Sequence, residues 1–399
     1  MNPWRDTRPL MILVAILFLG ILTMWIPARW ALSAFQVAIF ALAAFRLMPG
    51  IVSQRRPDQT LRRLIPHPVG ALLGAAAAWG LLQLALDRSV YRLATWEAIL
   101  IWTTNLAAFL LAFDAGAIRR QRERLLQAIL IFTFVLGIVA TFTLLTSPAG
   151  KVFWTFPSGS DGPTLGPFVY RNQYASFVEA VLPLAIVRAI LDRRRTWIYT
   201  LITAALFASV VAGGSRTGTF LCLGEILAVP VLAFAQGVIS RGFLARVVLG
   251  SVAAVILLTA VVGFDVIWTR LQEPNPYSVR RQLLESSLEM TRDRPLMGFG
   301  LGTWSTAYPG YAHFDNGTFV NQAHNDWAQW AAEGGLPFFA ILAAIAIWAI
   351  RPALRSLWGI GILAVLLHCF LDYPMQQRPA LAAFFFAILG FLAASDRES

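Results

Sequence analysis

His324 is the residue of this sequence whose type and setting are best suited to proton transfer. It opens the run His324-Asn325-Asp326-Trp327, and Gly335 follows eleven residues later, just before a long apolar block. A neutral imidazole in a polar setting can accept the proton of a hydroxyl group near neutral pH. The sequence therefore makes His324 a candidate general base, with Asn325 and Asp326 as supporting residues.

Two other interpretations of His324 stay open. An isolated histidine is more often an exposed loop side chain that takes no part in chemistry. A metal site could instead use His313, His324 and Asp326. That spacing matches no standard ligand pattern, and no cysteine assists it, so we expect no metal here.

Arginines form the second group of candidates. Arg216 lies in the small-residue run 213–218 between two apolar blocks, Arg171 lies at the start of another block, and Arg280 and Arg281 are in a polar segment. The guanidinium group matches phosphate oxygens, and an arginine close to hydrocarbon needs a partner. We expect Arg171, Arg216 and Arg281 to bind an anion such as a diphosphate, with Arg280 in support. The alternative for Arg216 is a snorkelling side chain or a structural ion pair.

His324, Arg280 and Arg281 share a polar segment of about 70 residues, 264–337. Within it, Ser278 begins a predicted helix that runs to Arg294 and is stopped by Pro295. An apolar stripe at helical spacing makes this helix amphipathic, so we expect it to lie along the outer membrane surface. The stripe consists of Val279, Leu283, Leu284 and Leu288.

The glycines of residues 295–304 are the next feature of the polar segment. Gly298, Gly300 and Gly302 could suggest a phosphate-binding loop, but no strand precedes them and no Lys-Ser/Thr pair follows. We expect a flexible turn at the headgroup level. Tyr308 and the aromatic residues after it are typical of interface anchors, and such rings can also stack on sugars.

Composition places most of the chain in a membrane. The sequence is 58% hydrophobic and 13% charged, against about 25% charged residues in an ordinary soluble domain. Its net charge of +11 could suggest nucleic acid, but membrane orientation and anionic headgroups explain it with fewer assumptions. Cys222 and Cys369 both lie within apolar blocks, so no disulfide framework is implied.

The apolar blocks predict an all-α, polytopic integral membrane protein with about twelve transmembrane helices. Backbone polar groups cannot stay unpaired in lipid, so each crossing must be helical. We expect the first block to be a retained signal anchor. The predicted spans are 9–27, 30–48, 68–86, 94–115, 125–146, 172–191, 197–213, 217–235, 243–263, 338–351, 354–371 and 380–395.

Basic residues give this map its orientation. With the N-terminus inside, 20 of them fall on the cytoplasmic side and 7 in the short outer loops. The positive-inside rule then puts both termini in the cytoplasm. We therefore divide the chain into spans 1–9 (1–263), a large periplasmic loop region between spans 9 and 10 (264–337), and spans 10–12 with a short tail (338–399). The stretch Gln54–Arg63 reads as a cytoplasmic surface loop.

The order of these motifs resembles the O-antigen ligase and polymerase superfamily of bacterial polysaccharide membrane enzymes. The resemblance rests on His324-Asn325 with Gly335, on Arg281 followed by the run 292–302, and on segments 172–175 and 214–216. It covers residues 165–340 by motif and the whole chain by topology. Glu285 departs from the pattern, because a tryptophan is common at that position.

The resemblance implies a membrane glycosyltransferase that needs neither a metal ion nor a cofactor. Its donor would be a glycan on undecaprenyl diphosphate at the periplasmic face of the bacterial inner membrane. A ligase would transfer this glycan to the lipid A-core, and a polymerase would transfer it to another lipid-linked repeat unit. In this reading the arginines hold the diphosphate and His324 deprotonates the acceptor hydroxyl. We favour the ligase.

A lipid-glycan or solute transporter is the competing class. Twelve spans with both termini inside is a common transporter layout. Transporters, however, place buried charges near the bilayer midplane, whereas the charged candidates here gather in one outer segment. We therefore favour an enzyme.

Overall fold

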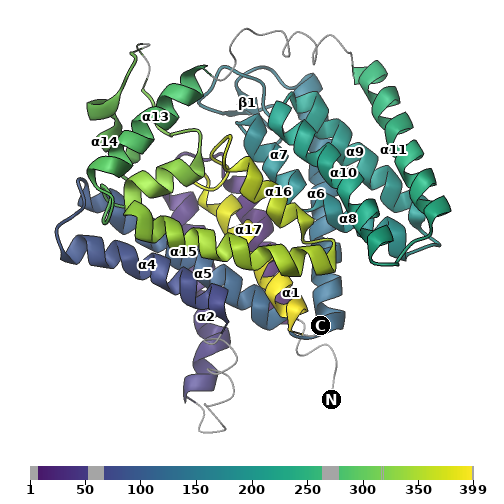
Figure 1. The fold of residues 1–399 in the computed structure, drawn as a ribbon, viewed down its shortest axis with the longest axis horizontal. Helices are drawn as coiled ribbons and strands as arrows, with labels where there is room; N and C mark the ends of the chain where they lie inside the picture. Colours follow the sequence, from purple (N-terminus) through teal and green to yellow (C-terminus); the bar gives the residue numbers. More distant parts are fainter. Residues whose placement is uncertain (1–7, 53–66, 263–277, 316, 318, 398–399) are drawn as a thin grey trace.

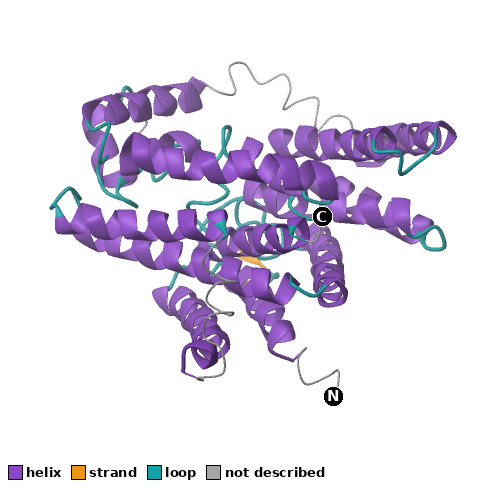
Figure 2. Ribbon diagram, turned by 60° about the horizontal axis from the view of Figure 1, so that its bottom comes forward, coloured by secondary structure: helices purple, strands orange, loops and turns teal. Residues whose placement is uncertain are grey.

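The computed structural model describes residues 8–52, 67–262 and 278–397, apart from 316 and 318. About three quarters of the structure is helical, and a short two-stranded ribbon lies in the segment between α6 and α7 (Figures 1 and 2). The loop predicted at Gln54–Arg63 lies outside the described residues. In chain order the helices and strands are α1 (Arg8–Thr23), α2 (Arg29–Val52), α4 (Pro68–Ala85), α5 (Arg92–Gly116), α6 (Arg119–Thr146), β1 (Lys151–Val152), β2 (Phe156–Pro157), α7 (Arg171–Glu179), α8 (Leu182–Leu191), α9 (Thr196–Gly213), α10 (Arg216–Ala235), α11 (Arg241–Val262), α13 (Ser278–Asp293), α14 (Trp304–Ala307), the 3-10 turn η1 (Tyr308–Tyr311), α15 (Asp326–Ser356), α16 (Ile360–His368) and α17 (Pro379–Asp396).

Within the described residues, eight membrane-length stretches of helix identify a polytopic membrane protein. They are long and apolar enough to cross a bilayer, and they include every predicted span from 68–86 to 217–235. The predicted spans 9–27 and 354–371 correspond to α1 and α16, which are shorter helices. The total of twelve spans stays a prediction. The eight stretches are Pro68–Ala85, Arg92–Gly116, Arg119–Thr146, Arg171–Leu191, Thr196–Gly213, Arg216–Ala235, Asp326–Ser356 and Pro379–Asp396.

The centre of the molecule is formed by α17 and the α7–α8 segment. In the apolar stretches of α17 and of α7–α8, 83% and 89% of the residues are buried inside the protein. The corresponding share is 39% in each of α4, α6, α9, α10 and α15. Close packing of α17 on α5 depends on Gly390, where a Cβ atom would lie 2.4 Å from the carbonyl oxygen of Phe109. Small residues allow such approach between membrane helices. Around this centre, α11 forms one edge and α13 and α14 cover the opposite end (Figure 1).

The predicted span 172–191 is broken in the structure. It consists of α7 and α8, which meet at Ala180 and Val181, with Pro183 in the first turn of α8. Proline lacks the N–H group that would continue the α7 ladder. The break leaves Glu179 at the end of α7, where its carboxylate lies 2.8 Å from Nδ1 of His368.

The predicted start of span ten at residue 338 falls inside a longer helix. α15 begins at Asp326 and is kinked at Gly335, which has φ 72° and ψ −179°. Side chains from 326 to 335 are buried in protein, so this first section can carry the polar residues that made it read as a loop. The polar segment that follows α11 thus gives way to helix earlier than we predicted.

The helix predicted from 278 to 294 is confirmed as α13, but the predicted apolar stripe is wrong in part. Val279 and Leu288 are exposed, and the buried face instead includes Leu283, Ser287 and Met290. Ser287 accepts a hydrogen bond from Nε1 of Trp304, at 3.0 Å. The hydroxyl is therefore satisfied inside a small second core that joins α13 to α14 and η1.

Loop ends that the charge pattern assigns to one side of the membrane contact one another. On the side predicted to be cytoplasmic, Arg188 donates to the carbonyl of Glu123, and Gln236 donates to that of Leu354. On the side predicted to be periplasmic, the contacts are Val90 to Phe299, Asn172 to Ser215, Gln173 to Gln377, and Arg378 to Met24.

Candidate active site

A buried carboxylate, Asp372, organises the polar cluster around His324. It lies in the segment between α16 and α17 and has no exposed side-chain surface. Its Oδ2 atom accepts hydrogen bonds from Nη2 of Arg280 at 2.9 Å, from the hydroxyl of Tyr170 at 2.8 Å and from the side-chain amide of Asn172. Its Oδ1 atom accepts from the backbone N–H of Tyr373 at 2.9 Å.

His324 lies beside this carboxylate. Its Nδ1 atom is 3.4 Å from Oδ1 of Asp372, and its ring meets the ring of Tyr373 edge-on, with centroids 4.6 Å apart. The side chain is 27% exposed, so the ring is held by protein on one side and open to solvent on the other. Its φ of 52° is in the left-handed region, which is uncommon for residues other than glycine.

The charges around Asp372 keep it ionised. Burial alone would raise its pKa, but the neighbouring His324 imidazole and the positive charge of Arg280 outweigh burial and lower the pKa to about 2. Burial and the neighbouring Asp372 charge raise the pKa of Tyr170 and Tyr373 well above the ordinary tyrosine range, so both phenols stay protonated. The cluster therefore presents a fixed negative charge behind the imidazole.

The N-terminus of α15 holds the Asp372 segment in place. Asn325 caps the helix by accepting from the backbone N–H of Ala328 at 2.9 Å, and it donates to the carbonyl of Phe370 at 2.8 Å. Asp326 is fully buried, and its Oδ2 atom accepts from the backbone N–H of Met375 at 3.0 Å. These two predicted supporting residues position the backbone on both sides of Asp372.

The α7 and α10 N-termini reach the same cluster. Asn172, which donates to Asp372, also accepts at Oδ1 from the hydroxyl of Ser215 at 2.7 Å. Ser215 is the N-cap of α10 and accepts in turn from the backbone N–H of Gly218. Arg171 and Arg216 are the first residues of these helices. The structure thus brings both arginines within one residue of the network, and both side chains are half-buried.

Arg280 and Arg281 have different surroundings, although they are adjacent on α13. Arg280 donates to Asp372 and, at 2.7 Å, to the carbonyl of Leu371, so it ties α13 to the site. Arg281 is exposed. Within the described residues no hydrogen bond or ion pair involves its guanidinium group, which leaves that group available to a ligand.

Tyr308 and His313 lie apart from the cluster. Tyr308 is buried in the second core, where it stacks on Trp304 with ring centroids 4.5 Å apart. His313 pairs with Glu289 of α13 at 3.1 Å and is exposed. Within the described ranges no group of three or more His, Cys, Asp or Glu side chains is arranged to hold a metal ion.

The glycine-rich run 295–304 is not the flexible turn that we predicted. Gly298, Gly300 and Gly302 all have positive φ, and the segment is bound to α15. The backbone N–H groups of Gly302 and Trp304 donate to the carboxylate of Glu333, at 2.9 and 3.2 Å. The loop thus surrounds a carboxylate of its own chain and is held against α15 by these hydrogen bonds.

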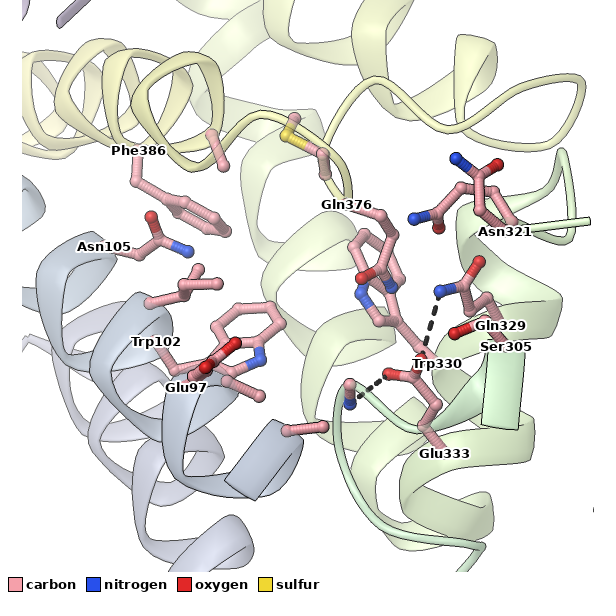
Figure 3. A pocket seen from close by; sticks show the side chains of 17 residues that line it. Glu97, Trp102, Asn105, Ser305, Asn321, Gln329, Trp330, Glu333, Gln376 and Phe386 are labelled. Atoms are coloured by element: carbon pink, nitrogen blue, oxygen red, sulfur yellow. Dashed lines mark hydrogen bonds between the residues drawn. The ribbon is translucent and has the colours of Figure 1, made fainter. Parts of the chain in front are cut away.

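A cavity of about 180 Å³ lies next to the segment that leads to His324 (Figure 3). Glu97, Trp102 and Asn105 of α5 face Gln329, Trp330 and Glu333 of α15 across it. Further lining residues come from the segments that carry the candidate base and its carboxylate, namely Asn321, Gln322, Met375 and Gln376.

Sequence reasoning missed Asp372, and it missed that His368 pairs with the buried Glu179. All three lie within or at the edge of apolar blocks that read as membrane spans. Their presence in apolar blocks was a signal that could have found them. An ionisable residue in a membrane segment almost always has a partner, so each one is a candidate for a buried polar site.

Comparison with known proteins gives one similarity, to a family model that covers part of the chain. None of the curated proteins matches the chain. The family model described as O-antigen ligase matches residues 201–343, which include Arg216, Arg280, Arg281 and His324 but not Arg171 or Asp372. This match confirms the resemblance that the motifs predicted: residues 201–343, less than half of the chain, are similar to the O-antigen ligase family.

Proposed function

We propose that the protein transfers a glycan from undecaprenyl diphosphate to a sugar hydroxyl of the lipid A-core, at the periplasmic face of the bacterial inner membrane. The family supports an O-antigen ligase or a related polymerase activity. The observation that carries the proposal is the pairing of His324 with a buried Asp372, among helix ends that bear arginines.

Acceptor activation follows from the direction of the imidazole. A proton on Nδ1 faces Asp372 at 3.4 Å, which leaves Nε2 as the proton acceptor. Nε2 takes the proton of the acceptor hydroxyl as its oxygen attacks the anomeric carbon of the donor sugar. The bond from that carbon to the diphosphate breaks, and the diphosphate leaves with the electron pair. Asp372 stabilises the imidazolium that forms, as the carboxylate does in other histidine-based sites.

Stabilisation of the leaving diphosphate falls to the arginines. In this proposal Arg171, Arg216 and Arg281 contact its oxygens, while Arg280 offsets the charge of Asp372 through a 2.9 Å ion pair. The N-termini of α7, α10 and α15 begin beside the same cluster and favour an anion there. Fixed positive charge in a site shielded from water stabilises a developing negative charge strongly, so no metal ion or cofactor is required.

A polymerase that joins lipid-linked repeat units is the second candidate, because the family match covers both activities. Only the acceptor differs. Deletion of the gene, followed by a lipopolysaccharide gel, separates the two. Loss of the O-antigen ladder with accumulation of long lipid-linked polymer identifies a ligase, and a single repeat on the core identifies a polymerase. An unchanged ladder, together with no transfer by the purified protein, would exclude both.

A further inference from the structure

The cavity of Figure 3 differs in chemistry from the arginine cluster, by which we mean Arg171, Arg216, Arg280 and Arg281 on α7, α10 and α13. Among the described residues that line it, two are acidic, Glu97 and Glu333, and none is basic. Glu97 is already paired with Arg29, so within the described residues the lining offers a diphosphate no cationic partner. It also carries too many amides for a hydrocarbon chain, because Asn105, Asn321, Gln322, Gln329 and Gln376 all contribute. The ligand that fits is neutral and rich in hydroxyl groups.

Polar atoms without partners face this space. Asn105 is 2% exposed, although it lies within the membrane-length helix α5, and its Oδ1 atom accepts no hydrogen bond from the described residues. Oε1 of Gln322 and Nε2 of Gln376 also lack partners among those residues. Burying a polar atom without a hydrogen-bond partner costs about 1–3 kcal/mol. A ligand or water molecule in the cavity would supply the missing hydrogen bond of each of these three atoms.

Aromatic walls complete the lining. Trp102 and Trp330 are nearly buried, with ring centroids 6.2 Å apart, and Phe386 of α17 packs edge-on against Trp102. A flat ring offers an apolar surface to the C–H face of a sugar, while amides and carboxylates bind its hydroxyl groups. Glu333 is itself fixed by Gly302, Trp304 and Gln329.

The position of the cavity indicates that it binds the acceptor rather than the donor. Residues 321–326 and 372–376 contribute to both places. Gln322 and Gln376 line the cavity, whereas His324 and Asp372, close to them in the same two segments, pair with each other. The arginines come from α7, α10 and α13, and the helical walls of the cavity come from α5, α15 and α17. A hydroxyl nucleophile must approach the anomeric carbon from the side away from the leaving diphosphate.

We propose that the cavity between α5, α15 and α17 is the subsite for a sugar ring of the acceptor glycan. This inference rests on the proposed function, because it takes the arginine cluster to hold the donor diphosphate. The sugar could belong to the lipid A-core or to a lipid-linked repeat unit, since both present neutral hydroxyl-rich rings. The cavity binds that ring so that its reactive hydroxyl reaches His324.

Two variants test the subsite, Asn105→Ala in the wall and Gln376→Ala in the loop. Each removes an amide, and losing one hydrogen bond should raise the KM for acceptor by roughly three- to tenfold, with the KM for donor unchanged. Gln236→Ala is the matched control, because Gln236 is exposed and donates to Leu354 at the far end of α10. If Asn105→Ala does not yield folded protein, Gln376→Ala keeps the test valid, since Gln376 lies outside the helices.

A binding measurement separates failure of the subsite from failure of the proposed function. Saturation-transfer NMR on the purified protein would use two probes, core oligosaccharide and released repeat-unit oligosaccharide. Binding that both variants weaken supports the subsite even if no transfer is observed, and the probe that binds identifies the acceptor. An unchanged acceptor KM in Gln376→Ala, or a raised donor KM, overturns the subsite and leaves the proposed function standing.

Discussion

At the scale of single residues, the direction of the His324 ring is set by a partner far away in the sequence. Asp372 lies 3.4 Å from Nδ1 and is fixed by Arg280, Tyr170 and Asn172. A carboxylate held in this way selects the tautomer whose Nε2 can accept a proton. His324 would be the group that touches the substrate, and Asp372 would be a positioning residue.

We predict that His324→Ala lowers glycan transfer by about a hundred- to ten-thousand-fold, the usual range for general acid–base catalysis. The protein should still be expressed and should still bind lipid-linked donor, because His324 is partly exposed and outside the main core. Transfer by purified variants in detergent measures the effect. His313→Ala is the control and should be far milder, since His313 pairs only with Glu289 at the surface. Activity within a few-fold of wild type would mean that His324 only positions substrate.

Asp372→Asn should lower kcat by roughly 10- to 100-fold, the range expected when a charged hydrogen bond is lost. The folded-state pKa of about 2 lies below the ordinary aspartate value of about 3.9, so ionised Asp372 stabilises the fold above pH 4. That contribution is lost as pH falls from about 4 through about 2. The free energy of unfolding of wild type should therefore exceed that of Asp372→Asn most above pH 4, and the difference should shrink as the pH falls towards about 2. An unchanged kcat would remove Asp372 from the mechanism.

Arg216→Ala and Arg281→Ala should each reduce transfer strongly while the protein stays in the membrane. The diphosphate needs fixed positive charge, and lysine should rescue poorly because it lacks the planar fork of arginine. The KM for donor, measured for the alanine and lysine variants, tests both points. Arg120→Ala is a suitable control on the opposite side of the predicted map. Full activity in both alanine variants would exclude these two residues as diphosphate ligands.

The sequence identified His324 and the arginines from residue type, but it could not predict their partners. Arg280 and Arg281 are adjacent, and only the orientation of α13 decides that Arg280 meets Asp372 while Arg281 stays exposed. Asp372 itself follows an apolar block, so it read as the edge of a span. Contacts between distant segments depend on tertiary packing, which hydropathy does not describe.

At the scale of elements, apolar blocks predicted helices well, and they failed where polar residues are buried in protein. Asp326, Gln329 and Glu333 made the first section of α15 read as a loop, yet all three are buried and hydrogen-bonded. The α7–α8 break was equally invisible, because Pro183 lies inside a continuous apolar run. Hydropathy measures the exclusion of side chains from water and cannot separate lipid from a protein interior.

The kink in α15 gives the element-scale prediction. Gly335 adopts φ 72° and ψ −179°, a conformation almost restricted to glycine, and a Cβ atom there would lie 2.6 Å from the backbone of Leu296. We expect Gly335→Ala to destabilise the protein by about 2–5 kcal/mol, the combined effect of backbone strain and overpacking. Gly310→Ala is the matched control, because nothing lies within 4 Å of a Cβ atom there.

Fluorescence-detected size exclusion after heating measures this difference. Gly335→Ala should lose its monodisperse peak at a lower temperature than wild type, whereas Gly310→Ala should match wild type. Equal thermal stability of the two variants would show that the kink is not required for folding.

At the scale of the whole molecule, the contacts between loop ends agree with the charge pattern. Links such as Asn172 to Ser215 and Gln236 to Leu354 join ends that the positive-inside rule assigns to the same side. A misassigned span would reverse every later loop and bring ends of opposite assignment together. The sequence therefore predicted which loops gather at each end of the bundle, although it could not predict how they touch.

We predict that Gly317 faces the periplasm and Arg120 the cytoplasm. Gly317 lies in the segment that leads to His324, and Arg120 lies in the first turn of α6 among basic residues that favour the cytoplasmic side. Cysteine introduced at each position can be labelled in spheroplasts with a membrane-impermeant thiol reagent. Background should be low, because Cys222 and Cys369 are both buried. Labelling at 317 but not at 120 is the expected result. The reverse would place the His324 cluster in the cytoplasm, where a periplasmic lipid-linked donor could not reach it.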